Sequence, residues 1–179
     1  MKSFFHAALA FALLAAPAHA QGEKFRTGPV FEDFGPVADV DADFSIPDKT
    51  KMRISFDVSK AADAGELNRT LVSAARFINM HARASVPIED INVAVVVHGK
   101  AVYDVSNAAR YADAIGGENA NAALIASLTG EGVRIIVCGQ SAAYYDVTND
   151  DLAPGVEMAL SAMTAHVLLQ QDGYAINPF

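Results

Sequence analysis

The sequence predicts an α/β protein built as a three-layer sandwich, in which helices cover both faces of a mainly parallel β-sheet. Residues 91–97 form a largely β-branched, apolar run, the type of strand that parallel sheets bury on both faces. Segments with the alternation of strands are separated along the chain by segments with helical spacing. This succession of strands and helices is typical of parallel α/β folds.

The beginning of the chain has the features of a secretory signal peptide, which we assign to residues 1–20. Lys2 supplies the positive start, residues 4–16 are apolar, and Ala18-His19-Ala20 is a small-x-small cleavage signal. We expect cleavage after Ala20 and a periplasmic or secreted mature protein with no membrane segment. The apolar stretch is short for a bilayer span, so an uncleaved anchor is the less favoured alternative.

Residues 21–49 are predicted to form an extended acidic arm, followed by the α/β domain at residues 50–179. The arm holds prolines, which disfavour both a helix and a central strand. Its isolated phenylalanines are expected to pack on a core, either of this chain or of a neighbour. Asp39, Asp41 and Asp43 alternate but lack the glycine and distal glutamate of an EF-hand, which favours a solvated acidic stretch over a calcium loop.

Regular structure is expected from residue 51 onward. Residues 52–58 alternate between apolar and polar and predict a strand. Asp63 and Glu66 have capping-box spacing, and apolar side chains then recur every three or four residues as far as Ala82. A helix is therefore predicted after Asp63, ending before Pro87.

The second half of the chain continues the same alternation. Ser161 is a plausible N-cap and Gly173 a plausible terminator for the last helix. After the strand at 91–97 we predict an irregular stretch, a helix over 118–129, a strand over 133–137, a polar loop over 139–154, a strand over 156–160, a helix over 161–171 and a short strand over 174–176.

Composition excludes several classes of function. The chain has 179 residues, 52% of them apolar, and a formal net charge of −8. Such an acidic surface repels phosphate backbones, so we expect no nucleic-acid binding. With a single cysteine, no disulfide can form within the chain.

That cysteine, Cys138, is the strongest functional candidate. It ends the predicted strand over 133–137, and open α/β sheets bind ligands at the outgoing ends of their strands. A buried, inert thiol is one interpretation. The other is a reactive thiolate, because Gly139 would leave the backbone beside the sulfur uncovered and free to stabilise an anion.

His98 ends the preceding strand and is the natural companion of Cys138. In a parallel sheet the two residues would emerge at the same edge, where an imidazole can lower the thiol pKa or transfer a proton. A histidine that merely bonds a loop carbonyl is the alternative. The polar loop adds Gln140, Ser141, Tyr144 and Tyr145 as candidate substrate-binding residues beside Gly139.

The sequence predicts neither a metal nor a cofactor. His81 and His166 share no ligand spacing with Cys138. No dinucleotide fingerprint follows a predicted strand. Ser141 stands where a dithiol redox motif would need its second cysteine, so disulfide cycling within one chain is not available.

Four segments resemble the DsrE/DsrF-like family, and the resemblance covers residues 51 to 176. They are Val133 to Ser141, Asp151 to Val156, Val95 to Gly99 and Leu168 to Tyr174. The resemblance implies a small α/β sandwich that assembles into trimers or hexamers. It also implies a sulfur relay, in which Cys138 would carry a persulfide and exchange sulfur with a donor or acceptor protein. Well-understood sulfur-relay members are cytoplasmic, whereas this chain is predicted to be exported.

Two functions follow from these observations. In the first, Cys138 is the thiolate of an exported sulfur carrier or sulfurtransferase, with His98 tuning the proton and the loop through Tyr144 and Tyr145 shielding the persulfide. In the second, the protein is a non-catalytic oligomeric ligand- or partner-binding protein, and the cysteine is structural.

Overall fold

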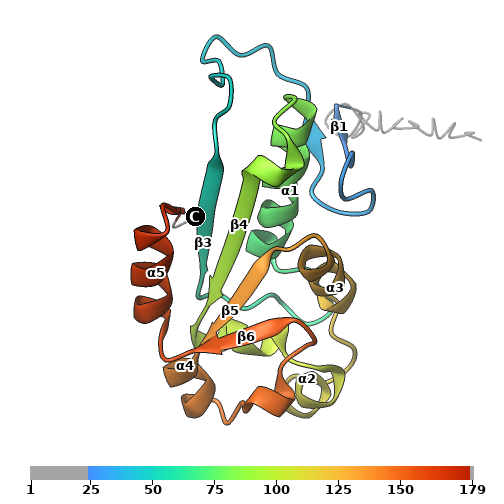
Figure 1. Cartoon of the computed structure of the whole chain (residues 1–179). Coiled ribbons are helices and arrows are strands. Elements are labelled where there is room, and N and C mark those ends of the chain that lie inside the picture. Colours follow the sequence, from blue (N-terminus) through green and yellow to red (C-terminus); the bar gives the residue numbers. More distant parts are fainter. Residues whose placement is uncertain (1–23, 178–179) are drawn as a thin grey trace, which may run out of the picture.

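The structure is a computed structural model that describes residues 24–177, and a five-stranded parallel sheet flanked by helices forms its centre (Figure 1). The predicted signal peptide, residues 1–20, lies outside the described residues. The strands are β1 (Phe25–Arg26), β2 (Val37–Ala38), β3 (Met52–Val58), β4 (Ile91–Val97), β5 (Arg134–Cys138), β6 (Val156–Ala159) and β7 (Ala175–Asn177). The α-helices are α1 (Arg69–Arg83), α2 (Ala108–Ala114), α3 (Ala122–Gly130), α4 (Gly139–Tyr144) and α5 (Ala162–Gln171), and the 3₁₀ helices are η1 (Ile88–Asp90), η2 (Gly99–Val105) and η3 (Asn149–Asp151).

Strand β4 lies at the centre of the sheet, whose order is β6-β5-β4-β3-β7. All four strand pairs are parallel. Val97 is the partner of Val58 on one side and of Val137 on the other, so β3, β4 and β5 end at the same level. This register sets which side chains meet at the carboxyl edge of the sheet.

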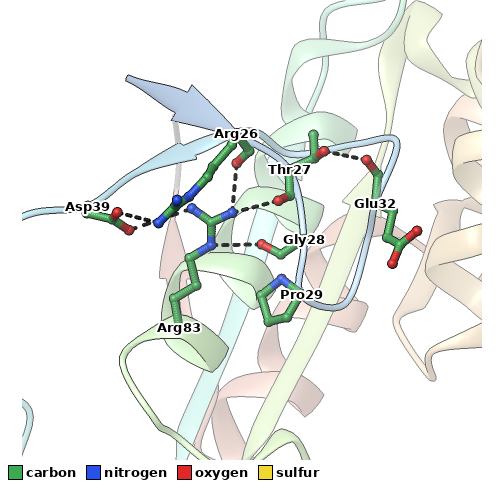
Figure 2. A pocket seen from close by; sticks show the side chains of 7 residues that line it. All are labelled: Arg26, Thr27, Gly28, Pro29, Glu32, Asp39 and Arg83. Carbon is green, nitrogen blue, oxygen red and sulfur yellow. Dashed lines mark hydrogen bonds and ion pairs between the residues drawn. The ribbon is translucent and has the colours of Figure 1, made fainter. Parts of the chain in front are cut away.

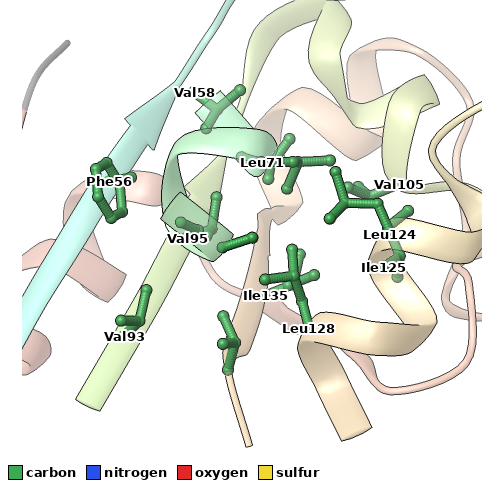
Figure 3. Close-up of a cluster of buried hydrophobic side chains, with 14 of the residues drawn as sticks. Phe56, Val58, Leu71, Val93, Val95, Val105, Leu124, Ile125, Leu128 and Ile135 are labelled. Atoms are coloured by element: carbon green, nitrogen blue, oxygen red, sulfur yellow. The ribbon is translucent and has the colours of Figure 1, made fainter. Parts of the chain in front are cut away.

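The two faces of the sheet bury separate apolar clusters, which confirms the predicted three-layer sandwich. On one face, Val93, Val95 and Ile135 pack with Leu71 of α1 and Leu124 of α3 (Figure 3). On the other face, a smaller cluster joins strand residues to α5; its buried members are Ala94, Val96, Ile136, Ala165 and Leu169. Because side chains alternate along a strand, one run of apolar residues serves both layers.

Several predicted boundaries are confirmed. The strands at 52–58 and 91–97 have the predicted limits. Ser161 caps α5 by accepting a hydrogen bond from the Thr164 amide, and Gly173 follows that helix with a φ of 85°. The predicted short last strand pairs with β3 at the sheet edge.

Other boundaries were wrong, and buried side-chain amides explain two of them. Helix α1 is capped by Asn68, whose side chain accepts from the Thr70 amide, and not by Asp63. Helix α3 begins at Ala122 rather than 118, because the Asn119 side chain accepts from the Asn121 amide just before it. The stretch after β4 was expected to be irregular but contains η2 and α2, and the predicted polar loop at 139–154 contains α4 and η3.

A buried polar network connects these helix starts to η2. Asp104 of η2 accepts hydrogen bonds from the Asn68 side chain at 2.7 Å and from the Ala62 amide at 2.8 Å. The Asn121 side chain accepts from the Asn68 amide at 2.7 Å. Burial raises the pKa of the Asp104 carboxyl, and these hydrogen bonds only partly oppose the shift. The network fixes the segment that follows His98 against the start of α1.

The arm packs on its own chain through Asn79 of α1. Asn79 is fully buried, and its side-chain oxygen accepts from the amides of Val30 and Phe31. Its amide group donates to the carbonyls of Phe31, Phe34 and Gly35. Phe31, only 4% exposed, joins the main core. At Gly35 a Cβ would lie 2.3 Å from the Arg76 amide nitrogen, so only glycine allows this contact.

Arg83 fastens the beginning of the arm to the same helix (Figure 2). Its guanidinium donates to the carbonyls of Arg26, Thr27 and Gly28, and lies 3.7 Å from the Asp39 carboxylate. A surface cavity of about 630 Å³ lies at this junction. Because the guanidinium is already engaged with the arm, we interpret the cavity as a consequence of arm docking and not as a ligand site.

The expectation that all the aromatics of the arm pack on a core was wrong in part. Phe31 and Phe34 contact the main core, but Phe25 is half-exposed and Phe44 is 96% exposed. Residues 39–49 are exposed throughout. The phenylalanines that pack on the core thus lie in the part of the arm that is hydrogen-bonded to Asn79 and Arg83. Within the described residues, no helix is long and apolar enough to cross a membrane.

Replacing Asn79 with alanine should release the arm. Five backbone groups would lose their buried partner, and we expect a loss of about 2–4 kcal/mol in the free energy of unfolding. Urea denaturation measures this loss, and limited proteolysis should show earlier cleavage before residue 40. Met80→Ala, at the exposed neighbouring position, is the control. An Asn79→Ala protein as stable and as protease-resistant as Met80→Ala would contradict this account of the arm.

Candidate functional site

Three strand ends bring Asp57, His98 and Cys138 to one edge and one face of the sheet. His98 and Cys138 directly follow the paired residues Val97 and Val137. Asp57 alternates with Phe56 and Val58, which face the main core, so its side chain lies on the opposite face, toward α5. The prediction that His98 and Cys138 emerge at the same sheet edge from neighbouring parallel strands is therefore confirmed.

Cys138 is buried, yet it lies outside the clusters in which the apolar side chains pack together. Only 6% of its surface is exposed, and it belongs to neither apolar cluster. It is the N-cap residue of α4, in extended backbone conformation, and it also pairs with Ala159 of β6. The sulfur thus lies where β5 passes into α4 and where the chain turns from β6 toward α5.

Polar groups around the sulfur favour the thiolate. Burial acts to raise the pKa of the Cys138 thiol, but the Ser141 amide and hydroxyl and the amides of Ala162 and Gln140 outweigh it and lower the pKa below its ordinary value. The thiol makes no side-chain cap bond with α4. A lowered thiol pKa is what nucleophilic cysteines require.

Gly139 has a different role from the one predicted. We expected this glycine to leave the backbone beside the sulfur uncovered. Instead, a Cβ at this position would lie 2.7 Å from the Ala159 carbonyl oxygen and 3.2 Å from that of Leu160. The glycine is needed because the chain after β6 packs directly on it. That close packing brings the start of α5, and with it the Ala162 amide, to the thiol.

The ring of His98 is hydrogen-bonded to a carboxylate. From the sequence, a bond to a loop carbonyl was the alternative to a role beside the thiol, and the structure has the carboxylate in its place. Its Nε2 lies 3.1 Å from Oδ2 of Asp57. His98 is not among the groups that shift the Cys138 pKa. Its backbone does contribute to the site, because the following amide, of Gly99, donates to the Ser141 hydroxyl oxygen at 2.9 Å. A direct proton transfer between His98 and the thiol stays a prediction.

Asp57 and His166 are residues that the sequence analysis missed as part of this site. Nε2 of His166, on α5, lies 2.8 Å from Oδ1 of Asp57, so the carboxylate bridges two histidines. Partial burial works to raise the Asp57 pKa, but the hydrogen bonds from His98 and His166 lower it below its ordinary value. The signal in the sequence was a charged residue one position before the end of a strand, on the face opposite its apolar neighbours Phe56 and Val58.

The predicted substrate-binding residues separate into two groups. Gln140 and Ser141 lie in the first turn of α4 and contribute to the environment of the sulfur. Tyr144 ends α4, away from Cys138, and is 80% exposed. Tyr145 packs against Tyr103 instead, with ring centroids 5.5 Å apart. The structure therefore does not bring the two tyrosines to the thiol.

The acidic and histidine side chains of the described residues do not gather into a metal-binding group. Among residues 24–177, no group of three or more His, Cys, Asp or Glu side chains is arranged to hold a metal ion. The histidine nitrogens that face Asp57 are already engaged in hydrogen bonds with its carboxylate. What the arrangement can do chemically is stabilise an anionic sulfur.

The fold and this edge define a class of protein: a small parallel α/β sandwich with a single cysteine at the outgoing end of a central strand. The family model of the DsrE/DsrF-like family matches residues 52–178. The chain belongs to this family, which is linked to sulfur relay.

Two solved structures share the fold. One is a protein of unknown function, MTH1491, from Methanobacterium thermoautotrophicum, with a TM-score of 0.54 and 21% sequence identity. The other is the ychN protein of E. coli, with a TM-score of 0.52 and 14% identity. Each match covers 72% of this chain and 99% of the other. No curated protein matches the chain significantly.

Removing the Ser141 hydroxyl should make the thiol less acidic. In Ser141→Ala the amide donor remains but the hydroxyl is lost, and we expect the pKa of Cys138 to rise by about 0.5–1 unit. The rate of iodoacetamide labelling against pH measures this pKa. Ser127→Ala, which removes an exposed α3 hydroxyl bonded to the Ala123 carbonyl, is the matched control. If Cys138 has the same pKa in Ser141→Ala and in Ser127→Ala, the Ser141 hydroxyl does not stabilise the thiolate.

Proposed function

We propose that this protein is a sulfur carrier or sulfurtransferase in which Cys138 holds a sulfane sulfur as a persulfide. The observation that carries the proposal is the set of donors from Gln140, Ser141 and Ala162, which lowers the thiol pKa. Family membership supports it, since the DsrE/DsrF-like family is linked to sulfur relay. The expected export would place this chemistry in the periplasm or outside the cell.

The transfer needs no external oxidant. The Cys138 thiolate attacks the terminal sulfur of a donor persulfide, R–S–SH, and a new S–S bond forms as the donor S–S bond breaks. The donor leaves as the thiolate R–S⁻ and takes up the proton that the Cys138 thiol released. One sulfur atom moves, and the sum of oxidation states is unchanged. The donors that favour the thiolate would also favour the anionic persulfide, since both carry negative charge on sulfur.

The structural-cysteine alternative is less well supported by the surroundings of the thiol. Burial alone agrees with it, because free cysteines are often small buried hydrophobes. An inert thiol in an apolar pocket would have a raised pKa, since burial disfavours the charged form. The pKa of Cys138 is lowered, and its neighbours are backbone amides and a hydroxyl.

Intact mass spectrometry tests the sulfur-carrier proposal. Reduced protein is incubated with an organic persulfide or inorganic polysulfide, and we expect one added sulfur atom that a thiol reductant removes. Cys138→Ser is the control and should gain nothing. If protein expressed with its leader is used, the mature chain should begin at Gln21, which tests the expected export. A wild-type protein that gains no more sulfur than Cys138→Ser across both donors would refute the carrier role.

We also propose that the protein self-associates, as the family resemblance implies. Exposed apolar side chains on and beside α5 support this proposal; they are Leu160, Met163, Val167 and Leu168. Burying such a patch against a second copy would stabilise an oligomer. We expect Met163→Glu to reduce the oligomer mass measured by light scattering. Met80→Glu, at an exposed methionine of α1, is the control, and equal masses for both variants would place the interface elsewhere.

A further inference from the structure

The groups that chiefly lower the pKa of the Cys138 thiol are its amide and hydroxyl neighbours, and Asp57 is not among them. Both hydrogen bonds of the Asp57 carboxylate nevertheless connect it to segments that hold those neighbours. Oδ2 of Asp57 faces Nε2 of His98 at 3.1 Å, and Oδ1 faces Nε2 of His166 at 2.8 Å. His98 directly follows β4, the strand beside the one that carries Cys138, and His166 lies on α5, which packs on one face of the sheet.

The first connection runs through His98 and the residue after it. The His98 ring is hydrogen-bonded to Asp57, and the backbone amide of His98 donates to the Val58 carbonyl at 2.8 Å. The next amide, of Gly99, donates to Oγ of Ser141 at 2.9 Å. The Ser141 hydroxyl oxygen accepts this bond, and the same hydroxyl is among the groups that lower the pKa of Cys138, so the Gly99 amide helps to hold it in place.

The second connection runs along α5. His166 lies four residues after Ala162, so the two occupy the same face of the helix, one turn apart. The bond between His166 and Asp57 ties that face of α5 to β3. The Ala162 amide, at the start of the same helix, contributes to stabilising the Cys138 thiolate. The position of this amide therefore depends on how α5 is fastened to the sheet.

The hydrogen bonds also define the tautomers of the two rings. An ionised carboxylate only accepts, so both Nε2 atoms must carry hydrogen. Nδ1 of His166 is buried and has no hydrogen-bond partner. The hydrogen bond to Asp57 is therefore what holds the His166 ring in place within the described residues. Asp57 thus fixes both ring orientations through one ionised group.

From this geometry we infer that Asp57 is a positioning residue for the Cys138 thiolate, acting through His98 toward Ser141 and through His166 toward Ala162. The inference rests on the proposed function, because it assigns Asp57 a task in preparing the same thiol. Hydrogen bonds and charge interactions with His98 and His166 favour the ionised form of the Asp57 carboxyl. Asp57 is not a catalytic residue in this scheme, since it does not touch the reacting sulfur.

The variant Asp57→Asn tests this inference, because the two possible effects of the substitution change the pKa of Cys138 in opposite directions. The two histidines bond different oxygens of Asp57, and an asparagine offers an accepting oxygen at only one of these positions and a donating nitrogen at the other. One connection must break or reverse, and we expect the Cys138 pKa to rise by about 0.5–1 unit, with a roughly three- to tenfold smaller thiolate fraction near pH 7. Loss of a nearby negative charge by itself would act in the opposite direction and lower the thiol pKa.

The measurement is iodoacetamide labelling rate against pH on the full mature chain, with intact mass to confirm single labelling. Asp113→Asn, which removes an exposed carboxylate of α2 paired with Arg110, controls for the change in net charge. A pKa that rises in Asp57→Asn and not in Asp113→Asn is the expected result. A pKa that is unchanged or lowered in Asp57→Asn would overturn the inference.

His166 variants keep the inference testable if Asp57→Asn does not fold. His166→Ala removes one connection, and we expect a smaller rise, with a roughly two- to threefold lower thiolate fraction. His166→Gln retains an N–H donor on the side chain and should restore part of the effect. His81→Ala, on α1, is the control for losing a histidine. Equal pKa values in His166→Ala and His81→Ala would contradict the second connection.

Labelling requires no sulfur donor, so the two proposals fail separately. A protein that responds to Asp57→Asn as expected but gains no sulfur retains the positioning role and loses the carrier role. A protein that gains sulfur but shows no response to Asp57→Asn retains the carrier role and loses the positioning role. If the wild-type thiol labels only after unfolding, both proposals are wrong.

Discussion

The parallel register of β4 with its two neighbours is the constraint on which the rest of the structure depends. Because Val58, Val97 and Val137 lie side by side, the residues next to them are carried to one edge of the sheet. Alternation along each strand then separates apolar side chains for the main core from those that face α5. A shift of one residue in either pairing would turn the polar residues of the site into the core and expose valines.

Side-chain amides satisfy several of the buried polar groups that lie outside the helices and the sheet. Asn79 provides both acceptor and donors to the arm, and Asn68, Asn119 and Asn121 close the network around Asp104. An amide can accept and donate at once, so one side chain can replace the missing partners of irregular backbone. The arm is therefore an integral part of the domain up to about residue 38, although it contains only two short strands.

At the carboxyl edge of the sheet, close packing and electrostatics act together. The chain after β6 approaches Gly139 so closely that no side chain fits there, and this brings the start of α5 beside the thiol. Burial alone would make the thiol a weaker acid. The surrounding amides and the Ser141 hydroxyl reverse that effect, which gives a covered sulfur with a lowered pKa. The proposed carrier role requires such a covered but ionisable sulfur.

The sequence by itself determined the fold class, the central strands and the shared edge of His98 and Cys138, because apolar periodicity is a local property. It also predicted the caps at Ser161 and Gly173, which depend on residues a few positions apart. It did not identify Asn68 as the cap of α1, α4 inside the predicted loop, or the bridge of Asp57 to His98 and His166. Asn68 is held by Asp104 and Asn121, 36 and 53 positions away, and Asp57 meets its two histidines 41 and 109 positions away. Only the tertiary structure brings these groups within hydrogen-bond distance.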